Sequence, residues 1–277
     1  MNGLDSVLEG LLEKSRAAEE PDDYTSGGLL YCGKCHAPKQ CPIEFEGVTI
    51  LAGCMCRCQE EAYEAEQREI RARERAMRIE ELRVNGIQDR AMREYTFDRA
   101  EETANIVKCR EYVRRWPEML KENCGLLLAG NPGTGKTFAA ACVANALISK
   151  GVPVLVTSFP KILNSGSWDK TTLTGQMKDF DLLVIDDLGT ERRDHGRANG
   201  YALEIVQMVI DERYKTQKPL IVTTNISRSQ MEEPENMEYC RIFDRLEEMY
   251  VPLFFGGGSR RKENAERKRR FMREVFG

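Results

Sequence analysis

The stretch GNPGTGKT, residues 130–137, places glycine, lysine and hydroxyl side chains at the spacing of a phosphate-binding loop. In this G-x-x-x-x-G-K-[ST] pattern the glycines let the backbone curl, so that several N–H groups point at phosphate oxygens. Lys136 is expected to reach the β- and γ-phosphates, and the Thr137 hydroxyl to ligate Mg²⁺. The predicted nucleotide-contacting residues are Gly130, Asn131, Pro132, Gly133, Thr134, Gly135, Lys136, Thr137 and Phe138. The loop therefore predicts a site for ATP and Mg²⁺.

Two further polar strand ends follow this loop in the sequence. The apolar run DLLVIDD ends in Asp186 and Asp187, fifty residues beyond Lys136. We expect Asp186 to hold Mg²⁺ through water and Asp187 to position or polarise the attacking water. Asn225 follows a later apolar run, IVTT, and is a candidate contact for the γ-phosphate or its water; an ordinary helix cap is the alternative. Together these residues predict ATP hydrolysis.

Four arginines in the last part of the chain could neutralise the γ-phosphate. Arg241 and Arg245 lie four residues apart in a predicted amphipathic helix, where either could reach the ATP site of a neighbouring subunit. A pair of ion-paired surface arginines is the alternative. Arg260 and Arg261 follow the glycine turn GGGS and suit closure over the phosphates; a solvated basic tail is the alternative. These arginines predict self-association through the ATP site.

The cysteines form a second group with the spacing of a binding site. Six of the ten cysteines fall within residues 32–58, and in a reducing compartment such a cluster favours metal over disulfides. The C-x-x-C turn aims two sulfurs at one centre, and CMCRC supplies the second half of a tetrahedral S₄ set. The predicted ligands of a structural Zn²⁺ are Cys32, Cys35, Cys56 and Cys58. The alternatives for one of these positions are Cys54, Cys41 and His36. A redox C-x-x-C is disfavoured, because no thioredoxin-like βαβ pattern surrounds it.

The sequence around the phosphate loop contains short apolar runs that alternate with amphipathic helices, and these elements must position the loop. Such runs are typical of buried parallel strands, so the chain predicts an α/β fold with the loop at the carboxyl end of a strand. The predicted strands are residues 124–129, 152–159, 181–187 and 219–226. Residues 59–83 are rich in Glu and Arg and predict a solvated helix. The predicted domains are 1–58, an amphipathic helix plus the zinc module; 59–94, a charged helical linker; and 95–277, the ATPase domain.

Composition and charge limit which binding partners and which location the sequence predicts. The net charge of −4 argues against a generally basic nucleic-acid-binding surface, so strand contacts would have to come from a local patch. The loop ERRDHGRANGY combines cationic and aromatic groups suited to single-stranded DNA, with a merely solvated loop as the equal alternative. Its residues are Arg192, Arg193, His195, Arg197 and Tyr201. With no secretory signal and no apolar run near ~18 residues, the sequence predicts a cytoplasmic protein without a membrane segment.

The motifs together resemble the DnaC-like replicative helicase loaders of bacteria and phages, a clade of AAA+ ATPases. The matching segments are GNPGTGKT, LLVIDDLGTE, TTN, RIFDRL and SRR, which span residues 125–261. The resemblance implies an AAA+ domain with a central parallel sheet flanked by helices. It also implies Asn225 as first sensor, Arg245 or Arg241 as arginine finger, and Arg261 or Arg260 as second sensor. The implied partners are a hexameric replicative DNA helicase, which the zinc module would grip, and single-stranded DNA.

One residue departs from the pattern of many AAA+ enzymes. Asp187 stands where those enzymes carry Glu, and its shorter side chain favours slow, switch-like hydrolysis, with Glu191 as a fallback candidate. ATPase helper subunits of transposition systems share nearly the same core and are the alternative function. A zinc adaptor that binds ATP only as a structural ligand is a third hypothesis, disfavoured by the intact Lys136 and Asp186.

Overall fold

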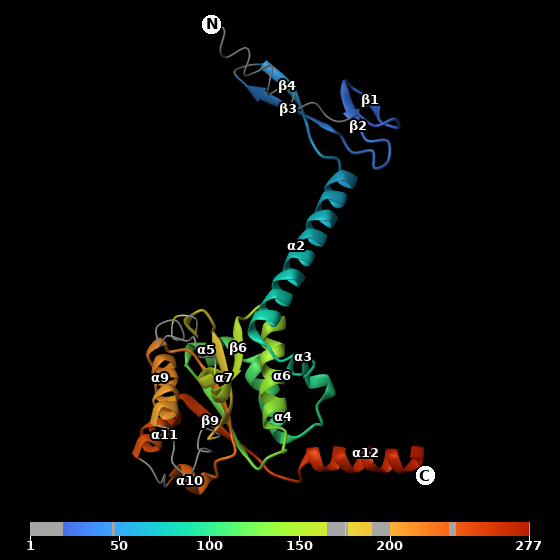
Figure 1. The fold of residues 1–277 in the computed structure, drawn as a ribbon. Helices are drawn as coiled ribbons and strands as arrows, with labels where there is room; N and C mark the ends of the chain where they lie inside the picture. Colours follow the sequence, from blue (N-terminus) through green and yellow to red (C-terminus); the bar gives the residue numbers. More distant parts are fainter. Residues whose placement is uncertain are drawn as a thin grey trace. The chain divides into compact units, whose positions relative to one another are not determined.

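The computed structural model describes residues 19–45, 48–164, 175, 177–189, 200–232 and 237–276. The chain divides into two compact units, Met1–Ala76 and Met77–Gly277, and the division falls inside the long helix α2 (Arg57–Gly86) (Figure 1). The predicted charged linker, residues 59–94, is therefore shared between the two units, and each unit is described separately below.

In its described residues, the first unit contains two small antiparallel strand pairs and the beginning of α2. β1 (Tyr24–Ser26) pairs with β2 (Leu29–Tyr31), and β3 (Gln40–Phe45) pairs with β4 (Val48–Gly53). The sequence analysis did not predict these strands; β1 and β2 have only three residues each, and Pro42 interrupts β3. α2 carries the charged helix predicted for residues 59–83, with i,i+4 ion pairs such as Arg57–Glu61 and Arg68–Glu64. The amphipathic helix predicted for the first twenty residues lies almost wholly outside the described residues.

The second unit is built on a parallel five-stranded sheet in the order β6-β7-β8-β5-β9. Its strands are β5 (Gly125–Gly130), β6 (Val154–Ser158), β7 (Leu182–Leu188), β8 (Leu220–Thr224) and β9 (Tyr250–Phe255). The four predicted strands are present, and the parallel α/β sheet is confirmed. β9 was not predicted, because Pro252 interrupts its apolar pattern; proline is tolerated there since β9 lies at the edge of the sheet.

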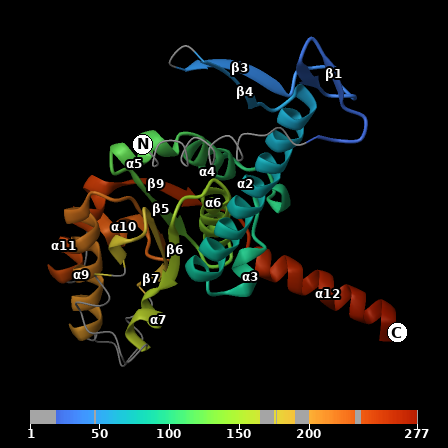
Figure 2. The same cartoon turned by 90° about the horizontal axis from the view of Figure 1, so that it is seen from above.

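Helices cover both faces of this sheet (Figure 2). The helices of this unit that the structure describes are α3 (Arg90–Arg93), the 3₁₀ turn η1 (Phe97–Arg99), α4 (Ala104–Arg114), α5 (Trp116–Lys121), α6 (Lys136–Ser149), α7 (Phe159–Asn164), α9 (Gly200–Thr216), α10 (Arg228–Glu232), α11 (Met237–Met249) and α12 (Arg260–Phe276). The last of them, α12, has no buried residue and does not cover the sheet. Alternate side chains of a strand enter opposite cores. Leu126 and Leu128 pack with α4 and α6, whereas Leu127 packs with α9 and α11. Within the part of the chain that the structure describes, no helix has the length and apolarity needed to cross a membrane.

A buried arginine of α9, Arg213, binds the segments that lead into β7 and β8. The Arg213 side chain is 1 % exposed, and its guanidinium donates to backbone carbonyl groups at 2.7–3.1 Å. The accepting carbonyls belong to Met177, Phe180, Asp181 and Pro219. Burial lowers the pKa of Arg213 to about 10, so it remains charged at neutral pH. This cation therefore fixes the starts of β7 and β8, whose other ends carry the predicted catalytic residues.

Candidate nucleotide site and cysteine cluster

The phosphate-binding loop leaves the carboxyl end of β5 and leads directly into α6. Gly133 and Gly135 have φ of 86° and 97°, a left-handed conformation that glycine adopts without a Cβ penalty. A Cβ on Gly133 would lie 2.2 Å from Ser259 Oγ, so a larger residue would have to displace the Ser259 side chain as well as strain the backbone. Gly135 precedes the first turn of α6, and no side chain caps that helix. The first N–H groups of α6 are therefore oriented toward an anion at the loop, as expected for phosphate.

Lys136 is held in the centre of this loop. Its Nζ donates hydrogen bonds of 2.8 Å to the carbonyls of Gly130 and Asn131 and to Asn225 Oδ1. The residue is only 5 % exposed; burial lowers the pKa of Lys136, while Asp187 and Asp186 act in the opposite direction. The structure thus brings together the predicted lysine and the predicted sensor asparagine, which come from different strand ends.

The Asp186 carboxylate accepts hydrogen bonds from two hydroxyl groups. Thr137 Oγ1 donates to Asp186 Oδ1 at 2.9 Å, and Thr223 Oγ1 donates to the same oxygen at 2.6 Å. Thr223 Oγ1 also accepts the backbone N–H of Asp187 at 3.0 Å, so one buried hydroxyl connects both acids. Asp187 itself has a φ of 61°, in the left-handed region. A threonine hydroxyl beside a carboxylate fits the oxygen ligands that Mg²⁺ requires at a nucleotide site.

A cavity of about 610 Å³ opens beside these groups. Its lining residues are Tyr95, Arg99, Pro132, Gly133, Gly135, Lys136, Thr137, Phe138, Asp187, Asn225, Arg260, Arg261 and Asn264. Arg260 and Arg261 both reach the cavity, so the structure does not choose between them as second sensor. Arg260 forms an ion pair with Glu101 at 3.1 Å, and its backbone N–H donates to Gly133 O.

Sequence reasoning missed Tyr95, the aromatic partner of the predicted Phe138 at this cavity. The ring centroids of Tyr95 and Phe138 lie 5.0 Å apart, and both side chains line the cavity. Asn145 of α6 donates to the carbonyls of Met92 and Tyr95, which ties the segment before η1 to the phosphate-loop helix. Tyr95 lies in a polar stretch that has no motif, so only the fold brings it here.

The candidate finger arginines do not line the cavity of their own chain. Arg245 of α11 forms an ion pair with Asp211 of α9, and Arg241 is exposed on the same helix. Glu191 and the predicted strand-binding residues Arg192, Arg193, His195 and Arg197 lie outside the described residues, and so does the side chain of Tyr201.

The four predicted zinc ligands form one cluster. The sulfur atoms of Cys32, Cys35, Cys56 and Cys58 all lie within 4.8 Å of one another. Cys58 Sγ is 3.5 Å from Cys32 Sγ and 3.3 Å from Cys56 Sγ. A tetrahedral site with ~2.3 Å Zn–S bonds separates its sulfurs by roughly 3.8 Å, so this donor set fits zinc. Among the described residues, the alternatives lie outside the cluster: Cys54 faces Pro38 O, His36 contacts Tyr24, and Cys41 is exposed.

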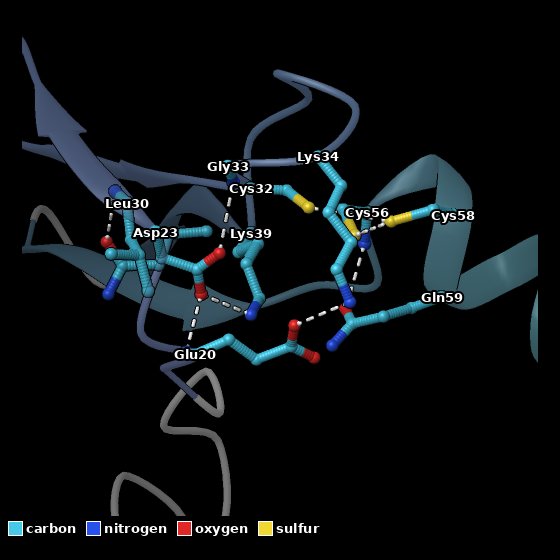
Figure 3. A network of polar contacts seen from close by, with 11 residues as sticks. Glu20, Asp23, Leu30, Cys32, Gly33, Lys34, Lys39, Cys56, Cys58 and Gln59 are labelled. Atoms are coloured by element: carbon cyan, nitrogen blue, oxygen red, sulfur yellow. Dashed lines mark hydrogen bonds and ion pairs between the residues drawn. The ribbon is translucent and has the colours of Figure 1, made fainter.

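A buried ion pair supports the cysteine turn (Figure 3). Asp23 accepts from Lys39 Nζ at 2.5 Å and from the backbone N–H groups of Glu20 and Gly33 at 2.8 and 3.2 Å. The hydrogen bond from Lys39 lowers the pKa of Asp23. Gly33 lies inside the C-x-x-C turn, where a Cβ would be 2.0 Å from Asp22 O. The backbone N–H groups of Cys35 and Lys34 lower the pKa of Cys32, which favours the thiolate that a metal binds.

A phosphate loop at the end of the parallel strand β5, with Asn225 after the neighbouring strand β8 and Asp186 near the end of β7 on the far side of β8, defines an ATP-binding domain of the AAA+ P-loop class. The chain belongs to the IstB-like ATP binding protein family, whose model matches residues 59–266.

Similarity to curated proteins agrees with the predicted resemblance to DnaC-like loaders. The replicative helicase loader DnaC of Escherichia coli (strain K12) is 29% identical over 149 residues, which cover 51% of this chain and 56% of DnaC. The replicative helicase loader DnaI of Bacillus subtilis (strain 168) is 28% identical over 151 residues, which cover 50% of this chain and 47% of DnaI. The chain thus matches about half the length of these relatives.

Comparison with solved structures gives matches to DnaI and to DnaC. The crystal structure of DnaI covers 62% of this chain and 93% of its own chain, at 20% identity and a TM-score of 0.49. The crystal structure of the DnaC helicase loader covers 61% of this chain and 100% of its own chain, at 22% identity and a TM-score of 0.48.

Proposed function

We propose that this chain is an ATP-controlled loader that binds a hexameric replicative DNA helicase and helps to place it on single-stranded DNA. The observation that carries the proposal is the convergence of Lys136, Asn225 and Asp186 at one edge of the sheet. This site lies within residues 59–266, which the family model matches, and about half of the chain is similar to the curated replicative helicase loaders DnaC and DnaI.

The proposed reaction is slow hydrolysis of ATP to ADP and phosphate. The phosphate loop and Lys136 hold the β- and γ-phosphates, and Thr137 and Asp186 hold Mg²⁺, which neutralises charge on the phosphate oxygens. Water attacks the γ-phosphorus while the bond to the ADP oxygen breaks. Asp187 positions this water and accepts its proton, and Asn225 orients the γ-phosphate. Tyr95 and Phe138 give the base an apolar surface on the same side of the site.

Control of the reaction would come from a second copy of the chain. Arg245 sits on α11 against Asp211, away from the cavity of its own chain. We expect it to exchange Asp211 for the γ-phosphate of a neighbouring chain, with Arg241 as the alternative. Because an arginine in trans stabilises the charge of the transition state, turnover would then depend on assembly, and hydrolysis would release the contact.

The cysteine module would form the helicase-binding part. A Zn²⁺ held by Cys32, Cys35, Cys56 and Cys58 replaces the apolar core that these two short hairpins lack. Contacts with single-stranded DNA are assigned to the loop that contains Arg192, Arg193 and Arg197.

The experiment is affinity capture from the source cell with the full-length tagged chain, in ATP and in ADP. Recovery of the replicative helicase with the wild type, and its loss with the Cys32→Ser, Cys35→Ser double variant, is the expected result. Lys136→Ala should lose ATP binding and assembly together. Arg245→Ala should keep ATP binding but lose assembly-dependent turnover, whereas Arg114→Ala, an exposed ion-paired control on α4, should change neither. Absence of the helicase from every eluate would refute the proposal.

A second candidate is supported by the family match, whose members are described as IstB-like ATP binding proteins. In that case the chain would be the ATPase helper subunit of a DNA transposition system. Recovery of a transposase in the same capture, without a helicase, would favour this function.

A further inference from the structure

A second cavity, of about 490 Å³, lies beside the edge strand of the ATPase unit. Its apolar surface comes from β9, α10 and α11, and includes Met231, Phe243, Tyr250, Pro252 and Phe254. Phe254 is 46 % exposed, which is unusual for a large aromatic side chain in a sheet. We call this cavity the β9 groove.

The β9 groove has an acidic rim. Asp244 and Glu247 lie one turn apart on α11 and line the groove, and neither forms an ion pair with any described residue. The basic residue of the groove, Arg228, is already paired with Glu232 at 2.7 Å and lies over the Phe254 ring. The groove therefore presents an apolar floor with uncompensated negative charge and fits a segment that is apolar and basic.

The chain itself contains such a segment in α12. This helix carries eight Lys or Arg residues against three Glu, in a chain whose net charge is −4, and none of its residues is buried. At its far end Phe271, Met272, Val275 and Phe276 are 49–77 % exposed. These four residues lie at i,i+1,i+4,i+5 spacing and share one face of the helix. Arg267 and Lys268 lie one turn earlier on the same face.

The start of α12 is fixed at the nucleotide cavity. Arg260 donates its backbone N–H to Gly133 O, and both Arg260 and Arg261 line the cavity. The β9 groove, in contrast, shares helix α11 with the two candidate finger arginines. A neighbouring chain that brings α11 to the ATP site therefore also brings its groove toward α12. The 17-residue helix is about 25 Å long, enough to run from the nucleotide cavity across an adjoining subunit.

We propose that α12 of one copy docks into the β9 groove of the next copy, with its apolar face on Phe254 and Pro252 and its basic residues at Asp244 and Glu247. The contact is heterologous, since the two surfaces differ, so it generates a ring or a helical filament. This docking contact rests on the proposed self-association through the ATP site. It would be a second contact between the same two subunits, one that does not include the nucleotide.

A charge-reversal exchange tests this contact in the full-length protein. The groove variant is Asp244→Lys with Glu247→Lys, and the helix variant is Arg267→Glu with Lys268→Glu. All four positions are exposed, so the fold should tolerate the changes. In each variant alone, the charges on α12 and in the β9 groove have the same sign, so the ATP-dependent assembly should be lost. Sedimentation velocity over a series of protein concentrations measures this assembly. Mixed one to one, each helix again meets a groove of opposite charge, and assembly should return.

The control is Arg71→Glu with Arg75→Glu on α2, which makes the same change in net charge as the helix variant, at exposed positions, and should assemble like the wild type. Normal assembly of either groove or helix variant alone, or a mixture that stays monomeric, would overturn the docking contact. A helix variant that assembles normally but no longer binds a single-stranded oligonucleotide would also overturn it and make α12 a nucleic-acid site. If Arg245→Ala still abolishes assembly-dependent turnover in these cases, the proposed function survives; a wild type that stays monomeric in ATP refutes the self-association itself.

Discussion

Thr223 is the residue whose replacement most directly tests the magnesium site. Its buried hydroxyl donates to Asp186 Oδ1 at 2.6 Å and accepts the Asp187 backbone N–H at 3.0 Å. Thr223→Val keeps the shape of the side chain but removes both hydrogen bonds. Asp186 then loses one of the two hydroxyl groups that orient it, and the Asp187 N–H loses this acceptor.

The size of the effect follows from these two contacts. Leaving a buried donor unsatisfied costs about 1–3 kcal/mol of the free energy of unfolding. Removing a group that orients a metal ligand weakens metal affinity by about 10–100-fold. We therefore expect Thr223→Val to raise the Mg²⁺ concentration that half-saturates nucleotide binding at least about tenfold.

Thr224 provides a matched control for this prediction. It is equally buried, donates to Leu188 O at 2.8 Å and accepts from Ile226 N at 3.1 Å, and contacts neither acid. Thr224→Val should therefore lower the free energy of unfolding in urea by a similar amount. The Mg²⁺ concentration that half-saturates nucleotide binding should stay that of the wild type. Titration of Mg²⁺ against a fluorescent ATP analogue measures the difference. Equal Mg²⁺ dependence in the two variants would refute the assignment of Asp186 as the magnesium ligand.

Four further predictions follow from the described contacts. Arg213→Met leaves buried carbonyls without a donor and should lower the free energy of unfolding in urea by about 3 kcal/mol or more; a loss below about 1 kcal/mol would contradict this. Cys35→Ser should reduce the zinc bound per chain, measured by elemental analysis, without changing ATP affinity. Lys39→Met should release zinc to a chelator faster than Lys34→Met, because only Lys39 is buried in its ion pair. Tyr95→Ala should weaken binding of ATP but not of inorganic triphosphate, and equal weakening would exclude a contact with the base.

The candidate site residues that the sequence predicted and the structure brings together depend on local spacing. The phosphate loop needs a strand, a turn and a helix in that order, so Lys136 and Thr137 could be assigned from eight consecutive residues. The same holds for the C-x-x-C turn and for Asp186 at the end of an apolar run. Because carboxyl ends of parallel strands share one edge of a sheet, the approach of Asn225 to Lys136 also follows from the predicted fold.

The residues that the sequence did not reveal act across long separations. Asp23 and Lys39 are 16 positions apart in loops and form a buried pair only because both hairpins fold around the cysteine turn. Thr223 belonged to the TTN segment, but its contact with Asp186 depends on the pairing of β7 with β8, which no local pattern specifies. Cys56 and Cys58, in contrast, were predicted, and they join the sulfur cluster at the start of α2, whereas Cys54 does not.

The uncapped first turn of α6 has a thermodynamic consequence. This helix contributes eight buried apolar residues to the core, yet its N-cap residue, Gly135, has no side chain that could accept from the first N–H groups. A bound phosphate group would supply the missing acceptor, so the nucleotide would serve as the N-cap of the central helix of the domain. A ligand at 100 times its dissociation constant stabilises its protein by about 2.7 kcal/mol. Protection of the α6 amides against hydrogen exchange would then rise with ATP concentration, and the order of the domain core would depend on the ATP supply.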